Sequence, residues 1–347
     1  MRLRLTALVL LVVALSGCGG SSSPPESEGQ VTLPEETLAP ILDYRLEGWS
    51  ETDFSKRVVE LDEFQSGGPP KDGIPPIDTP RFAPVAETEY IDDREPVIEL
   101  VVDGEARAYP IQILIWHEIV NDEVAGVPVA VTFCPLCNTA IVFDRRLDGR
   151  TLDFGTTGKL RNSDLVMYDR QTESWWQQFG GDGLVGHYAG EELEQLPARI
   201  VSWEQFRREH PDALVLTRDT GNDRDYGRNP YEGYDDVDSP PFFEVAGGDD
   251  DRLPPKERVV LIESGDEAVV VPYSVLRKRE RLEVELDGRT FEVSFRQDVA
   301  SALDDAEIAE SADAGAAEVR EDGELVPFDE PFWFAVAAFR PDARIIR

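Results

Sequence analysis

The sequence predicts a β-rich α+β fold, built from antiparallel hairpins with a few short helices. Short apolar runs broken by Asp-Gly pairs, as in 97–109 and 139–158, are typical of hairpins. Apolar residues at helical spacing occur only in short stretches, such as 110–118. An internal repeat is the third observation, because residues 97–133 align without a gap with residues 259–295.

The chain of 347 residues is 41% hydrophobic, which is enough to form a substantial core. We expect a single β-rich domain over residues 31–347. The repeat divides this domain into two pseudo-equivalent halves, at about 85–220 and 255–347.

The N-terminus has the pattern of an export signal. Two arginines within the first four residues precede an apolar run over 5–15, which is too short to span a bilayer comfortably. The run ends in Leu-Ser-Gly-Cys, which resembles a bacterial lipobox. We therefore expect a lipoprotein signal peptide over 1–17, lipidation of Cys18 and a flexible tether over 18–30. The alternative is an ordinary signal peptide with a chance cysteine.

These features predict a protein outside the cytoplasm, anchored by lipid in the cell membrane or the outer membrane. No other stretch of the sequence is apolar enough to span a membrane. The formal net charge of −36 argues against nucleic acid or anionic lipid as a partner.

The first elements follow from turn and period signals. Proline and glycine dominate 66–82, which we expect to be an ordered loop wrapped over the surface. Residues 97–109 predict a hairpin around an Asp-Gly turn. The segment 110–118 opens with proline and predicts a short helix whose inward residues are Ile111, Leu114 and Ile115.

The next elements continue the same pattern. Residues 124–133 predict a strand, and 139–158 predict a hairpin turning at a second Asp-Gly pair. Residues 163–179 predict two strands around a polar turn. A short helix is expected over 202–211, with a serine as its N-cap and a proline at its end.

The repeat does not extend to the chemically distinctive residues. At the shift of 162 residues, from 97 to 259, these residues meet unlike counterparts: His117 faces Arg279, Cys134 faces Arg296 and Cys137 faces Val299. If the repeat is real, the first copy holds the chemistry and the second is structural.

The pair Cys134 and Cys137 admits three interpretations. Cys-Pro-Leu-Cys between two strands resembles one knuckle of a rubredoxin or zinc ribbon, where Asn138 would take a left-handed conformation. A redox pair is a second interpretation, although no helix follows to lower the thiol pKa. The third is a disulfide, which would close a small, strained ring. The two cysteines are also the candidate catalytic residues.

A metal centre needs further ligands, and few soft or imidazole groups are present. His117 is the best candidate, with a buried histidine bonded to a carbonyl as the alternative; Met167 is the other candidate. Two thiolates, an imidazole and a thioether would favour copper over zinc. His187 is expected to be exposed, and His210 to be a helix C-terminal residue.

A polar segment with large aromatics follows the cysteines. Aromatic rings beside carboxylates suit a small-molecule cleft. The alternative is a hairpin whose rings fill the core and whose charges pair on the surface. The residues expected to line a pocket are Tyr109, Asn162, Ser163, Asp164, Asp169, Arg170, Trp175 and Trp176.

Several motifs in order resemble the domain of unknown function 3179 family. They are DGIPPIDTPRF, EARAYPIQILIWHEIVND, VTFCPLCNTAIVFDR, SDLVMYDRQTESWWQQ, HPDALVL and PFWFAVAAFRPD. The resemblance runs from about residue 60 to the C-terminus. It implies a bacterial or archaeal protein that is often exported or lipid-anchored, and it implies no particular activity.

The sequence therefore predicts an exported lipoprotein with a metal- or thiol-dependent site at the Cys-Pro-Leu-Cys motif. Copper or zinc binding ranks first. Thiol–disulfide exchange is one alternative, and non-catalytic binding of a small ligand in a tryptophan-rich cleft is another. Whether the protein is an enzyme, and its oligomeric state, are left open.

Overall fold

The fold is dominated by strands, which account for 39% of the structure, against 14% for helices. The structure is a computed structural model that describes residues 35–347. The predicted signal peptide over 1–17, the lipidation site Cys18 and the tether over 18–30 all lie outside the described residues. No helix in the described part of the chain has both the length and the apolar character needed to cross a bilayer.

Five sheets of three to five strands make up the body of the protein. The first has the order β1-β10-β11-β12-β13, with β1 (Gln65–Ser66), β10 (Phe154–Arg161), β11 (Asp164–Asp169), β12 (Trp175–Gln177) and β13 (Gly183–Val185). The second has the order β14-β7-β6-β5, with β5 (Ile119–Val124), β6 (Val127–Cys134), β7 (Thr139–Asp144) and β14 (Gln195–Leu196).

The third sheet has the order β15-β3-β4-β16-β2, with β2 (Phe82–Pro84), β3 (Pro96–Val102), β4 (Glu105–Pro110), β15 (Ala198–Ser202) and β16 (Leu214–Leu216). The fourth has the order β17-β18-β23, with β17 (Val259–Ser264), β18 (Glu267–Pro272) and β23 (Arg344–Ile345). The fifth has the order β19-β20-β21-β22, with β19 (Arg281–Leu286), β20 (Arg289–Arg296), β21 (Ala316–Glu321) and β22 (Glu324–Leu325). A small ribbon pairs β8 (Arg146–Leu147) with β9 (Arg150–Thr151).

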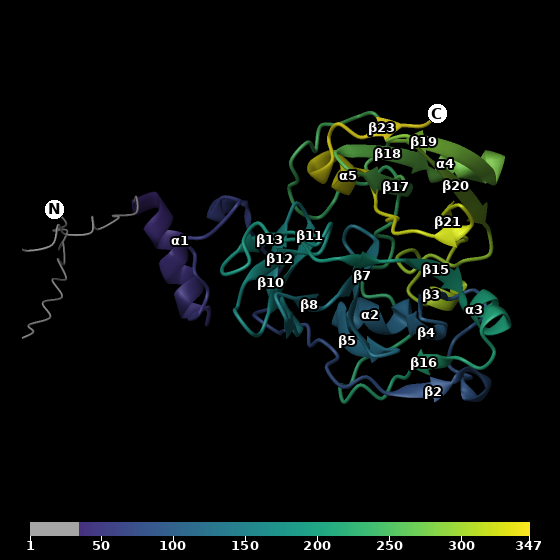
Figure 1. Cartoon of the computed structure of the whole chain (residues 1–347), viewed down its shortest axis with the longest axis horizontal. Helices are drawn as coiled ribbons and strands as arrows, with labels where there is room; N and C mark the ends of the chain where they lie inside the picture. Colours follow the sequence, from purple (N-terminus) through teal and green to yellow (C-terminus); the bar gives the residue numbers. More distant parts are fainter. Residues whose placement is uncertain (1–34) are drawn as a thin grey trace, which may run out of the picture.

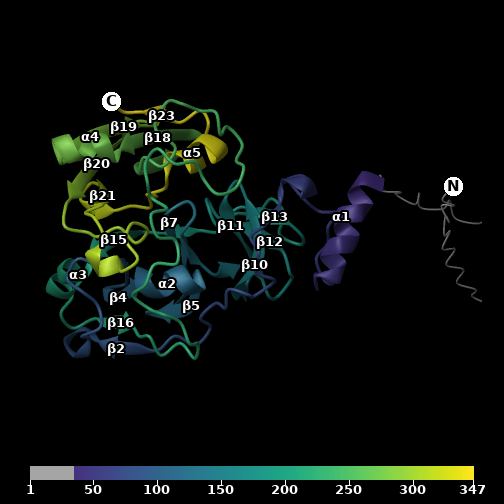
Figure 2. The same ribbon diagram turned by 180° about the vertical axis from the view of Figure 1, so that it is seen from behind.

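The five sheets are arranged as the blades of a five-bladed β-propeller. Figure 1 shows the fourth and fifth sheets at one end, the third at the other, and β10–β13 beside the N-terminal helix. Figure 2 gives the same arrangement from behind.

The predicted α+β class is therefore wrong, because the helices form no layer of their own. Four of them have seven residues each: α2 (Ile111–His117), α3 (Trp203–Glu209), α4 (Tyr273–Arg279) and α5 (Trp333–Phe339). The longer α1 (Glu35–Leu46) lies at one side of the molecule, and three 3-10 turns complete the set: η1 (Leu61–Glu63), η2 (Val85–Glu87) and η3 (Ile308–Glu310). Helices of two turns connect sheets and cannot cover one.

The two segments aligned by the repeat form the same elements at the same shift of 162 residues. Strands β4, β5 and β6 correspond residue for residue to β18, β19 and β20, and α2 corresponds to α4. Each copy gives its first hairpin to one sheet and its second hairpin to another, with the short helix between them. In each copy, a strand from further along the chain pairs in parallel with the first hairpin: β16 with β4, and β23 with β18.

Several of the individual elements predicted from the sequence are confirmed. The hairpin predicted over 139–158 is reduced to the small ribbon of β8 and β9, because β7 and β10 join different sheets. The hairpin at 97–109 turns at Asp103 and Gly104, both of which have positive φ. Helix α2 buries Ile111, Leu114 and Ile115, as expected. Helix α3 is capped by Ser202, whose hydroxyl accepts a hydrogen bond from the backbone N–H of the third helical residue.

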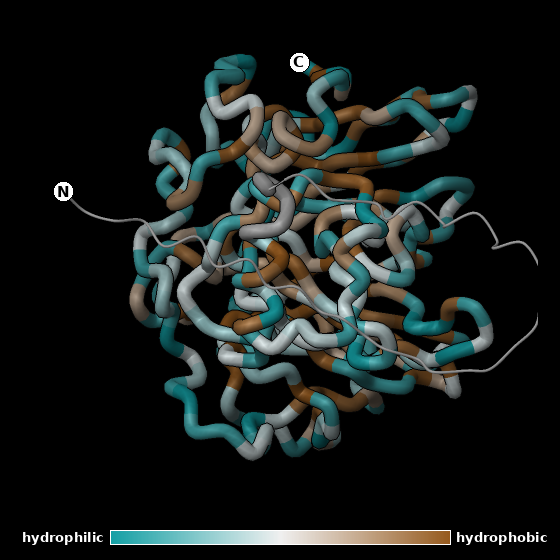
Figure 3. Tube along the Cα trace, turned by 90° about the vertical axis from the view of Figure 1, so that its left-hand side faces the viewer, coloured by the Kyte–Doolittle hydropathy of each residue, from teal (hydrophilic) through white to brown (hydrophobic). Residues whose placement is uncertain are grey.

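The largest core joins residues from all five sheets and includes both cysteines. Apolar residues concentrate along the strands in the interior, while the loops at the periphery are mostly hydrophilic (Figure 3). The Cys-Pro-Leu-Cys turn therefore lies inside the molecule, and its two thiols are shielded from water.

Candidate metal centre

The two cysteines flank the turn that joins β6 to β7. Cys134 is the last residue of β6 and pairs with Thr139, the first residue of β7. Asn138 closes the turn at φ 58°, in the left-handed region that the sequence predicted for it. The four-residue connection brings Cys137 back toward Cys134.

Distant segments fix this turn at three points. Tyr234 donates its hydroxyl to the carbonyl of Leu136 at 2.9 Å. The Asn138 amide donates to the carbonyl of Glu330 at 2.8 Å, and the backbone N–H of Phe332 donates to the carbonyl of Cys137 at 2.9 Å. The turn is thus held by residues about 100 and 190 positions along the chain, so its geometry depends on the complete fold.

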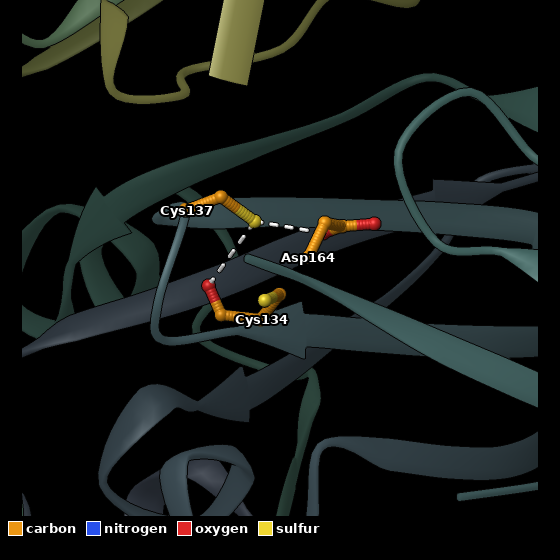
Figure 4. A group of neighbouring side chains, drawn as sticks. All are labelled: Cys134, Cys137 and Asp164. Atoms are coloured by element: carbon orange, nitrogen blue, oxygen red, sulfur yellow. Dashed lines mark hydrogen bonds between the residues drawn. The ribbon is translucent and has the colours of Figure 1, made fainter. Parts of the chain in front are cut away.

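Asp164 joins the two cysteines in one buried group (Figure 4). The ligand atoms of Cys134, Cys137 and Asp164 all lie within 4.8 Å of one another. The Cys137 thiol donates to Oδ1 of Asp164 at 2.7 Å. The three side chains are at most 1% exposed. Asp164 was predicted to line a pocket, and the structure places it instead beside the cysteine pair.

The carboxylate of Asp164 is fixed by its own element and the next strand. Asp164 begins β11 directly after Asn162 and Ser163, which form a two-residue hairpin turn at φ 52° and 61°. Its Oδ2 accepts hydrogen bonds from the Gln177 side chain at 2.6 Å and from the Phe179 backbone N–H at 2.9 Å. Only Oδ1 is then left to face the sulfur.

A second set of hydrogen bonds holds the Cys137 sulfur from the other side. Its Sγ lies 3.0 Å from Oγ1 of Thr139, which donates to the Gln178 side chain at 2.6 Å. Gln178 in turn donates to Oγ1 of Thr132 at 2.9 Å. The neighbouring amides Gln177 and Gln178 therefore position the carboxylate and the thiol, respectively. Such supporting partners orient the ligands of a metal centre.

Burial raises the pKa of all three groups. Loss of solvation is the largest cause for the pKa of Cys134, of Cys137 and of Asp164. The Asp164 charge raises the pKa of both thiols further. The thiols are therefore protonated at neutral pH unless a cation is bound beside them.

Glu118 adds a fourth buried acid near the group. Burial, followed by the charge of Asp164, raises the pKa of Glu118 to about 8. Glu118 ends α2 in a positive-φ conformation, and its carbonyl accepts a hydrogen bond from Phe133, one residue before Cys134. Glu118 could not be singled out from the sequence, because its repeat counterpart Glu280 is also a glutamate with the same backbone role, and only the fold buries one and exposes the other.

The structure does not bring His117 to the cysteines as a ligand. Its Nδ1 donates to the carbonyl of Pro75 at 2.6 Å, and its Nε2 lies 2.6 Å from the hydroxyl of Tyr226. Because the carbonyl must accept, Nε2 is the acceptor in the neutral ring, and burial lowers the pKa of His117. Both ring nitrogens therefore have hydrogen-bond partners. This arrangement matches the alternative interpretation of His117, a buried histidine bonded to a backbone carbonyl.

Met167 lies on β11, three residues after Asp164, and its side chain is buried in the main core. Residues three apart on a strand point to opposite faces. Met167 therefore shares the strand of the aspartate and faces away from it, which argues against a role as the thioether ligand.

The predicted tryptophan-lined cleft is not formed, because both rings are core residues. Trp175 is fully buried among four aromatic rings, those of Tyr44, Trp49, Phe54 and Phe64. Trp176 is fully buried and donates its indole N–H to Asp169 at 3.0 Å. Adjacent strand residues face opposite sides, so the two rings fill different cores.

The other predicted pocket residues have structural partners of their own. Tyr109 is buried and donates to Asp122 at 2.6 Å. Asp169 accepts from Thr172 and Trp176, and Arg170 donates to Asp78 at 2.7 Å. Asn162 accepts from the backbone N–H of Ala246 at 2.9 Å. These four residues form no common pocket with the cysteines.

Ser163 is the exception among them. It directly precedes Asp164, is 1% exposed, and its hydroxyl has no hydrogen-bond partner within residues 35–347. A buried hydroxyl without a partner is costly, so this position is suited to an oxygen ligand or a water molecule.

The fold and the site define a mostly-β protein whose core encloses two thiols and a carboxylate. The family model described as "Protein of unknown function (DUF3179)" matches residues 71–343. The chain belongs to this family, which confirms the resemblance seen in the motifs. No curated protein and no solved structure matches the chain. The function must therefore be inferred from the site itself.

Proposed function

We propose that the protein binds a zinc ion through the thiolates of Cys134 and Cys137 and the carboxylate of Asp164. The observation that carries the proposal is the convergence of three ligand atoms within 4.8 Å in a fully buried place. Two cysteines and one carboxylate are a ligand set that zinc accepts.

The balance of charge supports a bound cation. Glu118 is a fourth acid near the three ligands. The largest influences on the pKa values of these four groups are burial, hydrogen bonds and neighbouring acids, and none is a lysine or an arginine. Burying ionisable groups without a counter-charge is unfavourable, and a divalent cation removes this penalty.

The spacing requires a small adjustment on binding. The 2.7 Å contact between Cys137 Sγ and Asp164 Oδ1 is a hydrogen-bond distance. In a tetrahedral zinc centre, sulfur and oxygen would lie about 3.5 Å apart, given bonds of about 2.3 and 2.0 Å. Binding would therefore release the thiol proton and move the two atoms apart by about 0.8 Å.

The carboxylate shifts the preference from copper toward zinc. Copper was preferred for a centre that included an imidazole and a thioether ligand. The hydrogen bonds of His117 and the position of Met167 on β11 argue against both of these ligands. A hard oxygen ligand is a poor partner for monovalent copper and a good one for zinc. Three protein ligands also leave a fourth position, which a water or another small oxygen ligand would fill.

Thiol–disulfide exchange receives less support from the same geometry. An attacking thiol must be exposed and substantially ionised, whereas Cys134 and Cys137 are buried and burial raises the pKa of both. We expect the two thiols to react far more slowly with an alkylating reagent in the folded protein than in denaturant.

The test is the metal content of the full chain, purified without chelator and measured by mass spectrometry. We expect about one zinc per chain, and a loss of at least tenfold in affinity in Cys134→Ser and in Asp164→Asn. The matched control is Asp169→Asn, which changes another buried aspartate at the far end of the same strand, β11.

If Asp169→Asn retains zinc while Cys134→Ser and Asp164→Asn lose it, the three-ligand centre is supported. Equal loss in all three variants would indicate a general loss of folding, and circular dichroism of each variant would show this directly. Absence of bound zinc, with no zinc uptake by the folded wild-type chain, would refute the proposal.

We also propose that the protein is held outside the cytoplasm by lipid on Cys18. The support is the charged start, apolar run and Leu-Ser-Gly-Cys of the first 18 residues. In a bacterial host, the full chain should incorporate labelled fatty acid and sediment with membranes. Cys18→Ser should lose the label, and label that persists in this variant would contradict the assignment.

A further inference from the structure

A second group of potential ligands lies at the end of α3. The ligand atoms of Glu99, Glu209 and His210 lie within 4.8 Å of one another. Glu99 is on β3, while Glu209 ends α3 and His210 is its C-cap. The glutamate and histidine at the helix end are partly exposed, with 31% and 26% of their side chains accessible.

The buried member of this group has one oxygen atom without a partner. Glu99 is only 4% exposed, and its Oε2 accepts no hydrogen bond from the part of the chain that the structure describes. The nearest polar atom recorded for it is Nε2 of His210, at 3.4 Å. A buried carboxylate oxygen left free beside an imidazole is an incomplete arrangement, which a cation between the two atoms would complete.

Arg199 arranges the two carboxylates so that this oxygen is free. It pairs with Glu99 across the β3–β15 ladder and donates to Oε1 of Glu99 at 2.8 Å. It also donates to Oε2 of Glu209 at 2.7 Å. The guanidinium thus uses one oxygen of each carboxylate. It leaves Oε2 of Glu99 facing His210, while Oε1 of Glu209 lies 3.6 Å from the guanidinium of Arg208 at the surface.

The spacing of the free atoms matches a metal centre. Two ligand atoms bound to zinc at about 2.0 to 2.1 Å in tetrahedral geometry lie about 3.3 to 3.4 Å apart. Oε2 of Glu99 and Nε2 of His210 already lie 3.4 Å apart. Glu209, being partly exposed, can complete the set by a rotamer change, and water would fill the fourth position.

From this geometry we infer a second, surface-accessible site for a divalent transition-metal ion such as Zn²⁺, formed by Glu99, Glu209 and His210. The site joins α3 to β3. Through Arg199, which also contacts Glu318 on β21, it adjoins the contact between the third and fifth sheets. A bound ion would therefore fix α3 to β3 beside this contact.

The second site shares no residue with the cysteine centre and does not depend on it. The Arg199 guanidinium opposes a cation, so we expect weaker binding than at the thiolates. The two sites should fill in order as Zn²⁺ is added. The test can be made in the Cys134→Ser chain, so failure of one site is distinguishable from failure of the other.

The experiment is chemical modification of histidine in the full chain, with and without Zn²⁺. Diethylpyrocarbonate modifies accessible imidazole nitrogens, and mass spectrometry of peptides reports each histidine separately. His210 is partly exposed, and the exposed His187 serves as the internal reference. We expect Zn²⁺ to slow modification of His210 at least tenfold, and to leave His187 unchanged.

A pair of variants on one helix supplies the control. Glu209→Gln removes a proposed ligand, whereas Glu204→Gln changes an exposed glutamate in the first turn of the same helix. Protection of His210 should be lost in the first variant and kept in the second. Equal protection in both variants, protection that also covers His187, or no protection at all would overturn the site.

Discussion

At the scale of single residues, the cysteine turn depends on one strained position. Asn138 occupies the left-handed region at φ 58° and also donates to the carbonyl of Glu330. Asparagine is one of the few non-glycine residues that adopts this conformation readily. The sequence predicted the conformation from the motif, and it could not predict the partner, which lies almost 200 residues away.

Two substitutions at this position separate the backbone from the hydrogen bond. Asn138→Ala should lower the free energy of unfolding by about 2 to 3 kcal/mol, because it adds strain and leaves a buried carbonyl without its donor. Asn138→Gly should cost only about 1 kcal/mol, because glycine accepts the positive φ. Denaturant unfolding measures both. Equal losses would show that the hydrogen bond, and not the conformation, holds the turn.

The candidate site shows which residue-level inferences succeed from sequence. Cys134 and Cys137 are close in the chain, so their proximity was predictable from spacing alone. Asp164 was recognised as polar and interesting, but its approach to Cys137 results from the packing of two sheets. His117 is seventeen residues before Cys134, and the backbone carbonyl that accepts its hydrogen bond belongs to a loop, at Pro75. No local pattern contains such contacts.

At the scale of elements, the repeat provides an internal comparison. Glu118 and Glu280 end equivalent helices with nearly equal φ, 60° and 57°, and equivalent backbone hydrogen bonds. The first side chain is buried near the cysteines and the second is exposed. The backbone role is therefore duplicated, while the side chain acquires a different environment in each copy.

This pair leads to a prediction about pH. Burial raises the pKa of Glu118 from 4.5 to about 8. The folded protein therefore binds more protons than the unfolded chain between these values. The stabilisation from the protonated carboxyl is complete below about pH 4.5, and it is lost as the pH rises toward 8. Glutamine cannot ionise. The free energy of unfolding of Glu118→Gln should therefore be close to that of the wild type at pH 5 and higher than that of the wild type at pH 9 by more than about 2 kcal/mol.

The measurement is chemical unfolding from pH 5 to 9 in a chelator, because a bound metal ion would favour the charged carboxylate. Glu280→Gln is the matched control, since it makes the same change at the exposed equivalent position and should leave the pH profile unaltered. A Glu118→Gln profile parallel to that of the wild type would show that this carboxyl does not titrate in the predicted range.

At the scale of the whole molecule, the sequence predicted the hairpins but not their arrangement. Turn chemistry and strand period are local, and they located the hairpin at 97–109 and the helices at 110–118 and 202–211. The fold class depends on which sheet each hairpin joins. Strands β16 and β23 return from far along the chain to lie parallel to β4 and β18, and no local signal announces such pairings.

The net charge of −36 is also a property of the whole molecule. Seventy acidic and 34 basic residues leave an excess of like charge that repels itself most strongly in the compact folded state. Added salt screens this repulsion, since the Debye length falls from about 10 Å at 0.1 M to about 3 Å at 1 M. The folded state should therefore gain stability from salt, in contrast to a protein stabilised by surface ion pairs.

We expect Tm to rise by at least about 3 °C between 0.05 and 1 M NaCl, equivalent to roughly 2 kcal/mol for a chain of this size. Screening depends on ionic strength, so most of the rise should occur below about 0.3 M and be similar in NaCl and NaBr. A rise that continued in proportion to concentration and differed between the anions would indicate solvent exclusion instead. A fall in Tm would mean that the many surface ion pairs outweigh the repulsion, because salt weakens attraction between exposed charges as well.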